Sequence, residues 1–122
     1  MPLILEHVPG FSERWQAHLD HWDGEDAGPC NDMAAFAGYV VEVLQNKRQE
    51  NLEAVFGLIE KLMVEGDDTV RDVTATCFIE TLQNYASGSK IDSRDFVPYL
   101  GSESRAYAKA WDEFTGVKTE GL

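Results

Sequence analysis

EGDDTVRDVTATCFIETLQNYASG, residues 65–88, has the features of a helix at the centre of a helical domain. Gly66 ends a preceding helix, and Asp67 or Asp68 can cap the next one through a side-chain oxygen. No glycine or proline then interrupts the run until Gly88. The stretch therefore predicts one uninterrupted helix between two glycines.

The apolar residues of this helix predict that it is buried on most sides. At about 100° per residue they cover an arc of roughly 240°, far wider than a surface helix needs. Cys77 and Phe78 lie on this arc, so we expect both to be buried. A narrow exposed strip remains on the other side, at Asp72, Thr76, Glu80 and Gln83.

On both sides of the stretch, apolar residues recur with the period of a helix. In no segment do apolar and polar residues alternate with the period of two that marks a strand. Apolar stripes predict further helices over residues 12–22, 32–48, 50–65 and 102–115, and a short helix near residues 93–100. The expected fold is all-α, a single compact domain of five to six helices packed as antiparallel hairpins across residues 1–122. Residues 1–10 are expected to form a flexible lead-in, and residues 117–122 a flexible tail.

Composition and charge narrow the kinds of partner. The chain has 122 residues, 43% of them hydrophobic, and a formal net charge of −12. A charge of this sign and size disfavours direct binding to nucleic acid or to an anionic membrane, and it favours a basic protein partner.

The two cysteines suggest a reducing compartment. Cys30 lies in a Gly/Pro-rich stretch and Cys77 on the buried arc, 47 residues apart, without the short spacing of a metal knuckle or redox motif. Two unpaired thiols are typical of the cytosol. The N-terminus lacks the basic and apolar regions of a signal peptide, and no stretch approaches the length of a membrane span. We therefore expect a cytoplasmic protein.

Catalytic and metal-binding patterns are weak. His18 and His21 form an H-x-x-H pair beside several acids, which could hold a divalent metal, but His21 lies about 60° further round the helix than His18, so the two rings need not converge. No nucleophile–base order, P-loop or dinucleotide-binding glycine pattern is present. We expect a protein that is not an enzyme and has no metal or cofactor, with a small metal-dependent hydrolase as an alternative.

The negative charge is concentrated in the first part of the chain. No basic residue lies between Arg14 and Lys47, whereas residues 71–122 carry eight acids and six bases. A field of one sign steers a partner of the opposite sign. We therefore predict partner binding through one of two acidic clusters. The first cluster is Asp20, Asp23, Glu25, Asp26 and Asp32, and the second is Glu65, Asp67, Asp68, Asp72 and Glu80.

Four segments carry a resemblance to a known group of proteins. They are residues 50–62 (ENLEAVFGLIEKL), 65–68 (EGDD), 76–82 (TCFIETL) and the segment from Leu100-Gly101 to Trp111. Together they resemble a family of small, acidic, all-helical bacterial proteins of unassigned function. Several similar proteins are immunity proteins, which neutralise a toxin encoded beside them by binding to it.

The resemblance implies binding as the function and implies no particular site residue. An immunity protein for a nuclease toxin would place its carboxylates against the basic cleft that otherwise holds phosphates. The sequence therefore predicts an immunity protein with a cognate basic toxin domain as its partner. A helical protein-interaction scaffold or adaptor is the main alternative.

Overall fold

A computed structural model describes residues 2–47 and 50–122, and this part of the chain is helical without any strand. It contains seven α-helices, three short 3₁₀ segments and one π-helical segment, η2. In chain order they are α1 (Pro2–His7), η1 (Pro9–Phe11), α2 (Ser12–His21), α3 (Pro29–Asn46), α4 (Leu52–Glu65), α5 (Asp68–Thr74), η2 (Ala75–Ile79), α6 (Glu80–Ser87), η3 (Ser93–Asp95), η4 (Val97–Tyr99) and α7 (Ser102–Thr115).

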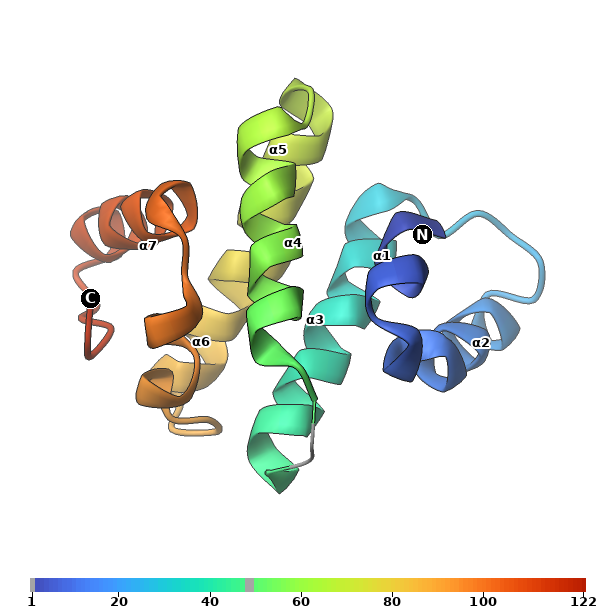
Figure 1. Ribbon diagram of the computed structural model, residues 1–122, viewed down its shortest axis with the longest axis horizontal. Helices are drawn as coiled ribbons and strands as arrows, with labels where there is room; N and C mark the ends of the chain where they lie inside the picture. Colours follow the sequence, from blue (N-terminus) through green and yellow to red (C-terminus); the bar gives the residue numbers. More distant parts are fainter. Residues whose placement is uncertain (1, 48–49) are drawn as a thin grey trace.

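The central helix predicted over residues 68–86 is confirmed as α5, η2 and α6, which follow one another without a break. Asp67 is its cap: a side-chain oxygen accepts a hydrogen bond from the Val70 N–H at 2.9 Å. Figure 1 shows α4 and α5 in the middle of the molecule, with α7 and the C-terminus on one side and α1 and α2 on the other.

The π segment changes which residues of the central helix are buried. A π turn takes up one extra residue, so every later side chain is rotated by roughly 100° relative to a regular helix. Gln83, predicted to be exposed, is only 1% exposed, whereas Tyr85, on the predicted buried arc, is 40% exposed. The predicted exposed strip is therefore correct for Asp72 and Thr76 and wrong for Gln83.

Five phenylalanine rings form the middle of the core. Phe78 lies at 5.5 Å from Phe36 of α3 and at 5.9 Å from Phe56 of α4, measured between ring centroids. Phe11 continues the row beyond Phe36, and Phe96 continues it beyond Phe56. Each ring is at most 1% exposed, so the prediction that Phe78 is buried is confirmed. This row of rings joins the N-terminal, central and C-terminal elements.

Both ends of the chain pack more closely than the sequence predicted. Residues 2–7 form helix α1 instead of a flexible lead-in, and Ile4 and Val8 enter the core at 4% and 1% exposure. The tail after α7 is non-helical, but the Asp112 carboxylate accepts a hydrogen bond from the Thr119 N–H at 2.7 Å. The Ser93 hydroxyl also donates to the backbone carbonyl of Glu120.

The prediction of two unpaired thiols is wrong. Cys30 and Cys77 form a disulfide with a Cα–Cα distance of 5.6 Å. The reason is that α3 begins at Pro29, so Cys30 belongs to its first turn and lies against the π segment that carries Cys77. The bond ties the start of α3 to the central helix.

Candidate partner-binding groove

A groove of about 460 Å³ lies where α1, the start of α3, the end of α4 and α5 meet. Most of its surface is apolar, and two aspartates and two threonines complete the lining. The lining residues are Leu3, Ile4, Asp26, Pro29, Asp32, Met33, Leu62, Thr69, Val70, Val73 and Thr74. Leu3 is 40% exposed, and Val70 and Val73 are half-buried, so apolar surface is open to a partner here.

Two members of the first acidic cluster line this groove. Asp26 is exposed, and one of its carboxylate oxygens accepts a hydrogen bond from the Gly28 N–H at 2.9 Å, which fixes the loop before α3. Asp32 is half-buried, and its Oδ1 lies 2.9 Å from His18 Nε2. The groove therefore has a negative edge that local contacts hold in place.

Three acids of the second cluster are neighbours in the sequence of residues that line the groove. Asp67 and Asp68 directly precede Thr69 and Val70, and Asp72 precedes Val73, all in or next to α5. Asp68 and Asp72 are exposed, and Glu65 is exposed at the end of α4. The two clusters, predicted as alternatives, thus lie on elements that border one groove.

Glu80 of the second cluster does not belong to this groove. Its carboxylate accepts hydrogen bonds from the Tyr107 hydroxyl and from Trp111 Nε1, both on α7. Burial of the Tyr107 ring, followed by the hydrogen bond to Glu80, raises the pKa of Tyr107 to about 12. Glu80 joins the central helix to α7.

The other three acids of the first cluster do not line the groove. Asp20 is exposed on α2 and accepts a hydrogen bond from Gln16 Nε2 at 3.1 Å. Asp23 adopts a left-handed backbone conformation with φ 48°, and Glu25 is exposed in the same loop.

The two histidines do not form a metal centre with the neighbouring acids. His18 stacks on Trp15 at a centroid distance of 5.3 Å and contacts Asp32, while His21 packs its edge against Trp22. Across residues 2–47 and 50–122, no three His, Cys, Asp or Glu side chains come together as possible metal ligands.

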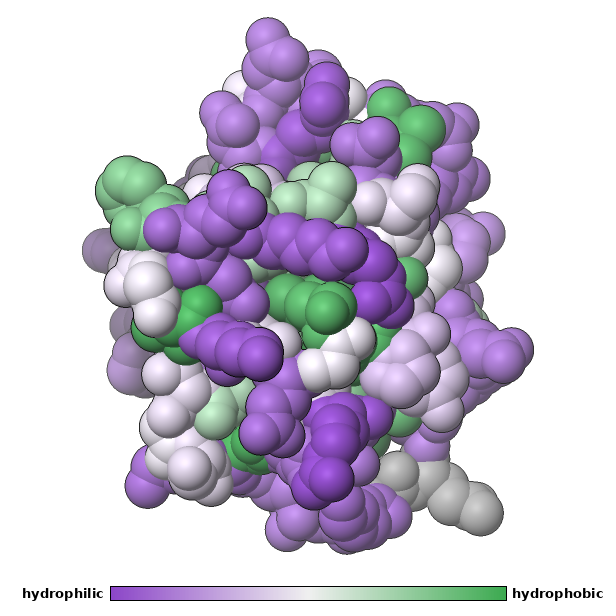
Figure 2. Space-filling model, turned by 90° about the vertical axis from the view of Figure 1, so that its left-hand side faces the viewer, coloured by the Kyte–Doolittle hydropathy of each residue, from purple (hydrophilic) through white to green (hydrophobic). Residues whose placement is uncertain are grey.

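The α7 side of the molecule offers no comparable apolar surface. Figure 2 shows this face with hydrophilic residues predominating and hydrophobic residues in small, separate patches. Phe114 is 90% exposed at the end of α7 but stands outside the core. The groove is thus the better candidate for a partner that needs both apolar and charged contacts.

The apolar walls of the groove were missed from the sequence. The Leu3-Ile4-Leu5 run is the signal that could have identified α1, but it is too short to show a helical period. Val70 and Val73 belong to the apolar arc of the central helix, so the sequence predicts that both are buried. In the structure both are half-buried and line the groove.

Comparison with protein-family models assigns the chain to a family. The model for a domain of unknown function, DUF7674, matches residues 1–116, which include every residue that lines the groove. Searches of curated proteins and of solved structures gave no significant match. None of the described helices has the length and apolar character needed to cross a membrane. The chain belongs to the DUF7674 family.

Proposed function

We propose that this protein is an immunity protein that binds a basic toxin domain, with the groove between α1, α3, α4 and α5 as the contact site. The observation that carries the proposal is the composition of the groove, whose mostly apolar lining includes Asp26 and Asp32 of the first acidic cluster. The net charge of −12 and the resemblance to small acidic bacterial immunity proteins support the same function.

The geometry fits a partner segment with one apolar and one basic side. The apolar side chains would occupy the walls formed by Leu3, Val70 and Val73, where burial from water supplies the driving force. Lysine or arginine side chains would reach Asp26 and Asp32 on one edge and Asp68 on the other. Because a nuclease domain must hold phosphates with such basic residues, binding here would remove them from the substrate.

The test compares a groove variant with a matched surface variant. Asp26→Asn combined with Asp68→Asn removes two charges and keeps side chains that can still accept hydrogen bonds. Asp26 lines the groove, and Asp68 directly precedes the lining residues Thr69 and Val70. The control, Glu53→Gln with Glu113→Gln, removes two exposed acids that neither line the groove nor adjoin a lining residue in the sequence. The partner is the basic domain encoded in the neighbouring reading frame, and binding affinity and protection of growth are measured together.

We expect the groove variant to lose affinity and protection and the control to keep both. Equal behaviour of the two variants would contradict the proposed site. Absence of any toxin domain in the neighbouring frame would contradict the immunity function.

A scaffold or adaptor is the second candidate, and the apolar character of the groove favours it. An adaptor would depend on the walls more than on the acids. Val73→Lys should then abolish binding to several partners, while the Asp26→Asn/Asp68→Asn variant should bind them like the parent.

The cytoplasmic location expected from the sequence stays a prediction, and the disulfide provides its test. Glutathione keeps cytosolic thiols reduced, whereas disulfides persist in oxidising compartments. Trapping of thiols in intact cells should find Cys30 and Cys77 reduced if the protein is cytoplasmic. A fully oxidised pair would contradict that location.

A further inference from the structure

We propose that the Cys30–Cys77 disulfide is a redox switch that sets the affinity of the groove for its partner, a role that rests on the proposed function of the groove. In the oxidised protein the bond ties the start of α3 to η2. Reduction breaks this tie, and we expect the reduced protein to bind the partner more weakly.

Each cysteine is a close neighbour of residues that line the groove. Cys30 directly follows Pro29 and lies two residues before Asp32, and both of these residues line the groove. Cys77 lies three residues after Thr74, another lining residue, which is about one turn along the same continuous helix. The disulfide is thus a covalent link between the α3 wall and the α5 wall of the groove.

The first turn of α3 is not held by burial. Pro29, Cys30 and Asn31 are exposed, and Met33 is the first buried residue of this helix. The N-cap residue, Gly28, has a φ of 88° and makes no side-chain capping hydrogen bond. The position of this turn relative to the central helix therefore depends strongly on the disulfide.

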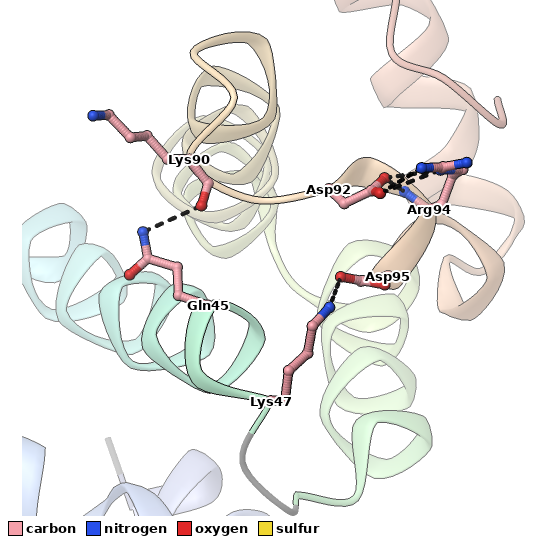
Figure 3. Close-up of polar contacts among 6 residues, drawn as sticks. All are labelled: Gln45, Lys47, Lys90, Asp92, Arg94 and Asp95. Atoms are coloured by element: carbon pink, nitrogen blue, oxygen red, sulfur yellow. Dashed lines mark hydrogen bonds and ion pairs between the residues drawn. The ribbon is translucent and has the colours of Figure 1, made fainter.

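The rest of α3 is held without the disulfide. In its middle, Phe36 belongs to the row of phenylalanine rings in the core. At its other end, Lys47 Nζ lies 2.7 Å from Asp95 Oδ2 (Figure 3). Gln45 Nε2 also donates to the backbone carbonyl of Lys90 at 3.3 Å. Reduction should therefore free the first turn and the loop before it, while the remainder of α3 keeps its place.

The bond can be reached by a reductant from one side, because Cys30 is exposed whereas Cys77 is only 6% exposed. A thiolate of a dithiol reductant attacks the Cys30 sulfur, forms a mixed disulfide with it and releases Cys77 as a thiolate that takes up a proton. The second thiol of the reductant then displaces Cys30. In total two electrons and two protons pass to the cysteines, and the reductant leaves as a disulfide.

The oxidised groove is ready for a partner because its two walls are already fixed relative to each other. Asp26 and Pro29, which line the groove, belong to the loop and the first turn that reduction frees. A partner of the reduced protein must order these residues again, and the loss of conformational entropy weakens binding. We expect reduction to weaken the affinity for the basic domain about tenfold.

The first measurement needs no partner. Amide NMR relaxation gives backbone order parameters for the oxidised protein, for the protein reduced with dithiothreitol and for the Cys30→Ser/Cys77→Ser variant. We expect the order parameters of residues 26–32 to fall in the last two samples and those of α7 to stay unchanged. Unchanged order parameters at residues 26–32 would overturn the switch. An equal fall in α7 would also overturn it, because the bond would then support the whole fold and not the groove.

The second measurement is the affinity for the basic domain encoded in the neighbouring reading frame, before and after reduction. Binding by the Cys30→Ser/Cys77→Ser variant should be weak and independent of the reductant, which controls for reduction of the partner itself. Equal affinity of the oxidised and reduced forms, in a protein whose Asp26→Asn/Asp68→Asn variant does lose binding, would overturn the switch alone. Failure of the proposed function is distinguishable, because that groove variant would then bind like its control in either redox state.

Discussion

At the scale of single residues, Glu60 has the most specific structural role outside the groove. Its carboxylate accepts hydrogen bonds from the N–H groups of Glu103 and Ser104, both at 2.9 Å, and from the Ser104 hydroxyl at 2.8 Å. The residue before α7 is Gly101, which has no side chain to act as a cap. Glu60 of α4 therefore caps α7 from a neighbouring helix.

Replacing this cap should destabilise the protein. Glu60→Ala removes the acceptor for three donors at the start of α7, and we expect the free energy of unfolding to fall by about 1–2 kcal/mol. The control on the same helix is Glu53→Ala, which removes an exposed carboxylate in the first turn of α4. Urea unfolding measures both, and equal stability of the two variants would contradict the capping role.

The same residue predicts a dependence of stability on pH. Burial acts to raise the pKa of Glu60, but the hydrogen bonds from Glu103 and Ser104 together outweigh it and lower the pKa below its ordinary value of 4.5. Because its pKa is lower in the folded state, ionised Glu60 stabilises the fold at pH values above its unfolded-state pKa. This contribution is lost as the pH falls through the folded-state pKa. Glu60→Gln should therefore lose less stability than the parent between pH 6 and pH 3; an identical loss would contradict this.

Phe78 should be the most costly single position to truncate. Its ring is fully buried, stacks on Phe36 of α3 and packs edge-to-face with Phe56 of α4. Phe78→Ala therefore leaves a cavity and should lower the free energy of unfolding by about 3–5 kcal/mol. Chemical denaturation measures the loss. A variant as stable as the parent would show that the ring is not central to the core.

At the scale of elements, the disulfide between α3 and the π segment should contribute strongly to stability. It closes a loop of 47 residues, and removing such a bond typically costs about 2–4 kcal/mol. Cys30→Ala combined with Cys77→Ala should therefore unfold at lower urea concentration, and adding reductant to the parent should have nearly the same effect. No change on reduction would contradict a formed bond.

The elements also show where sequence reasoning succeeds and where it fails. The central helix could be predicted because its signals are local: a glycine, a capping aspartate and an uninterrupted apolar run. The exchange of Gln83 and Tyr85 could not, because no local signal marks the π turn. The Cys30–Cys77 pair depends on contacts between distant segments, so spacing alone gave the wrong answer.

The same limit applies to the candidate site. The acids of both clusters could be chosen from charge alone, and Asp26 and Asp32 do line the groove. Asp67 serves as the helix cap, as the sequence predicted for Asp67 or Asp68, whereas Glu80 binds α7, a role that only the packing reveals. The groove itself joins α1, α3, α4 and α5, and no single stretch of sequence encodes such a surface.

At the scale of the whole molecule, the central claim is that acidic charge beside an apolar groove steers a basic partner into place. Attraction between exposed charges is screened over about 10 Å at 0.1 M salt, so steering weakens as salt rises. Apolar contacts in the groove are not screened in this way. Charge should therefore act mainly on the association rate, and the walls on the dissociation rate.

The most direct test is the association rate with the cognate basic domain, measured by stopped flow from about 0.05 to 0.5 M NaCl. For the parent we expect the rate to fall about tenfold or more over this range. The Asp26→Asn/Asp68→Asn variant should start slower and fall less steeply, while the Glu53→Gln/Glu113→Gln control should follow the parent. A parent rate that does not change with salt, or a groove variant indistinguishable from the control, would contradict the claim.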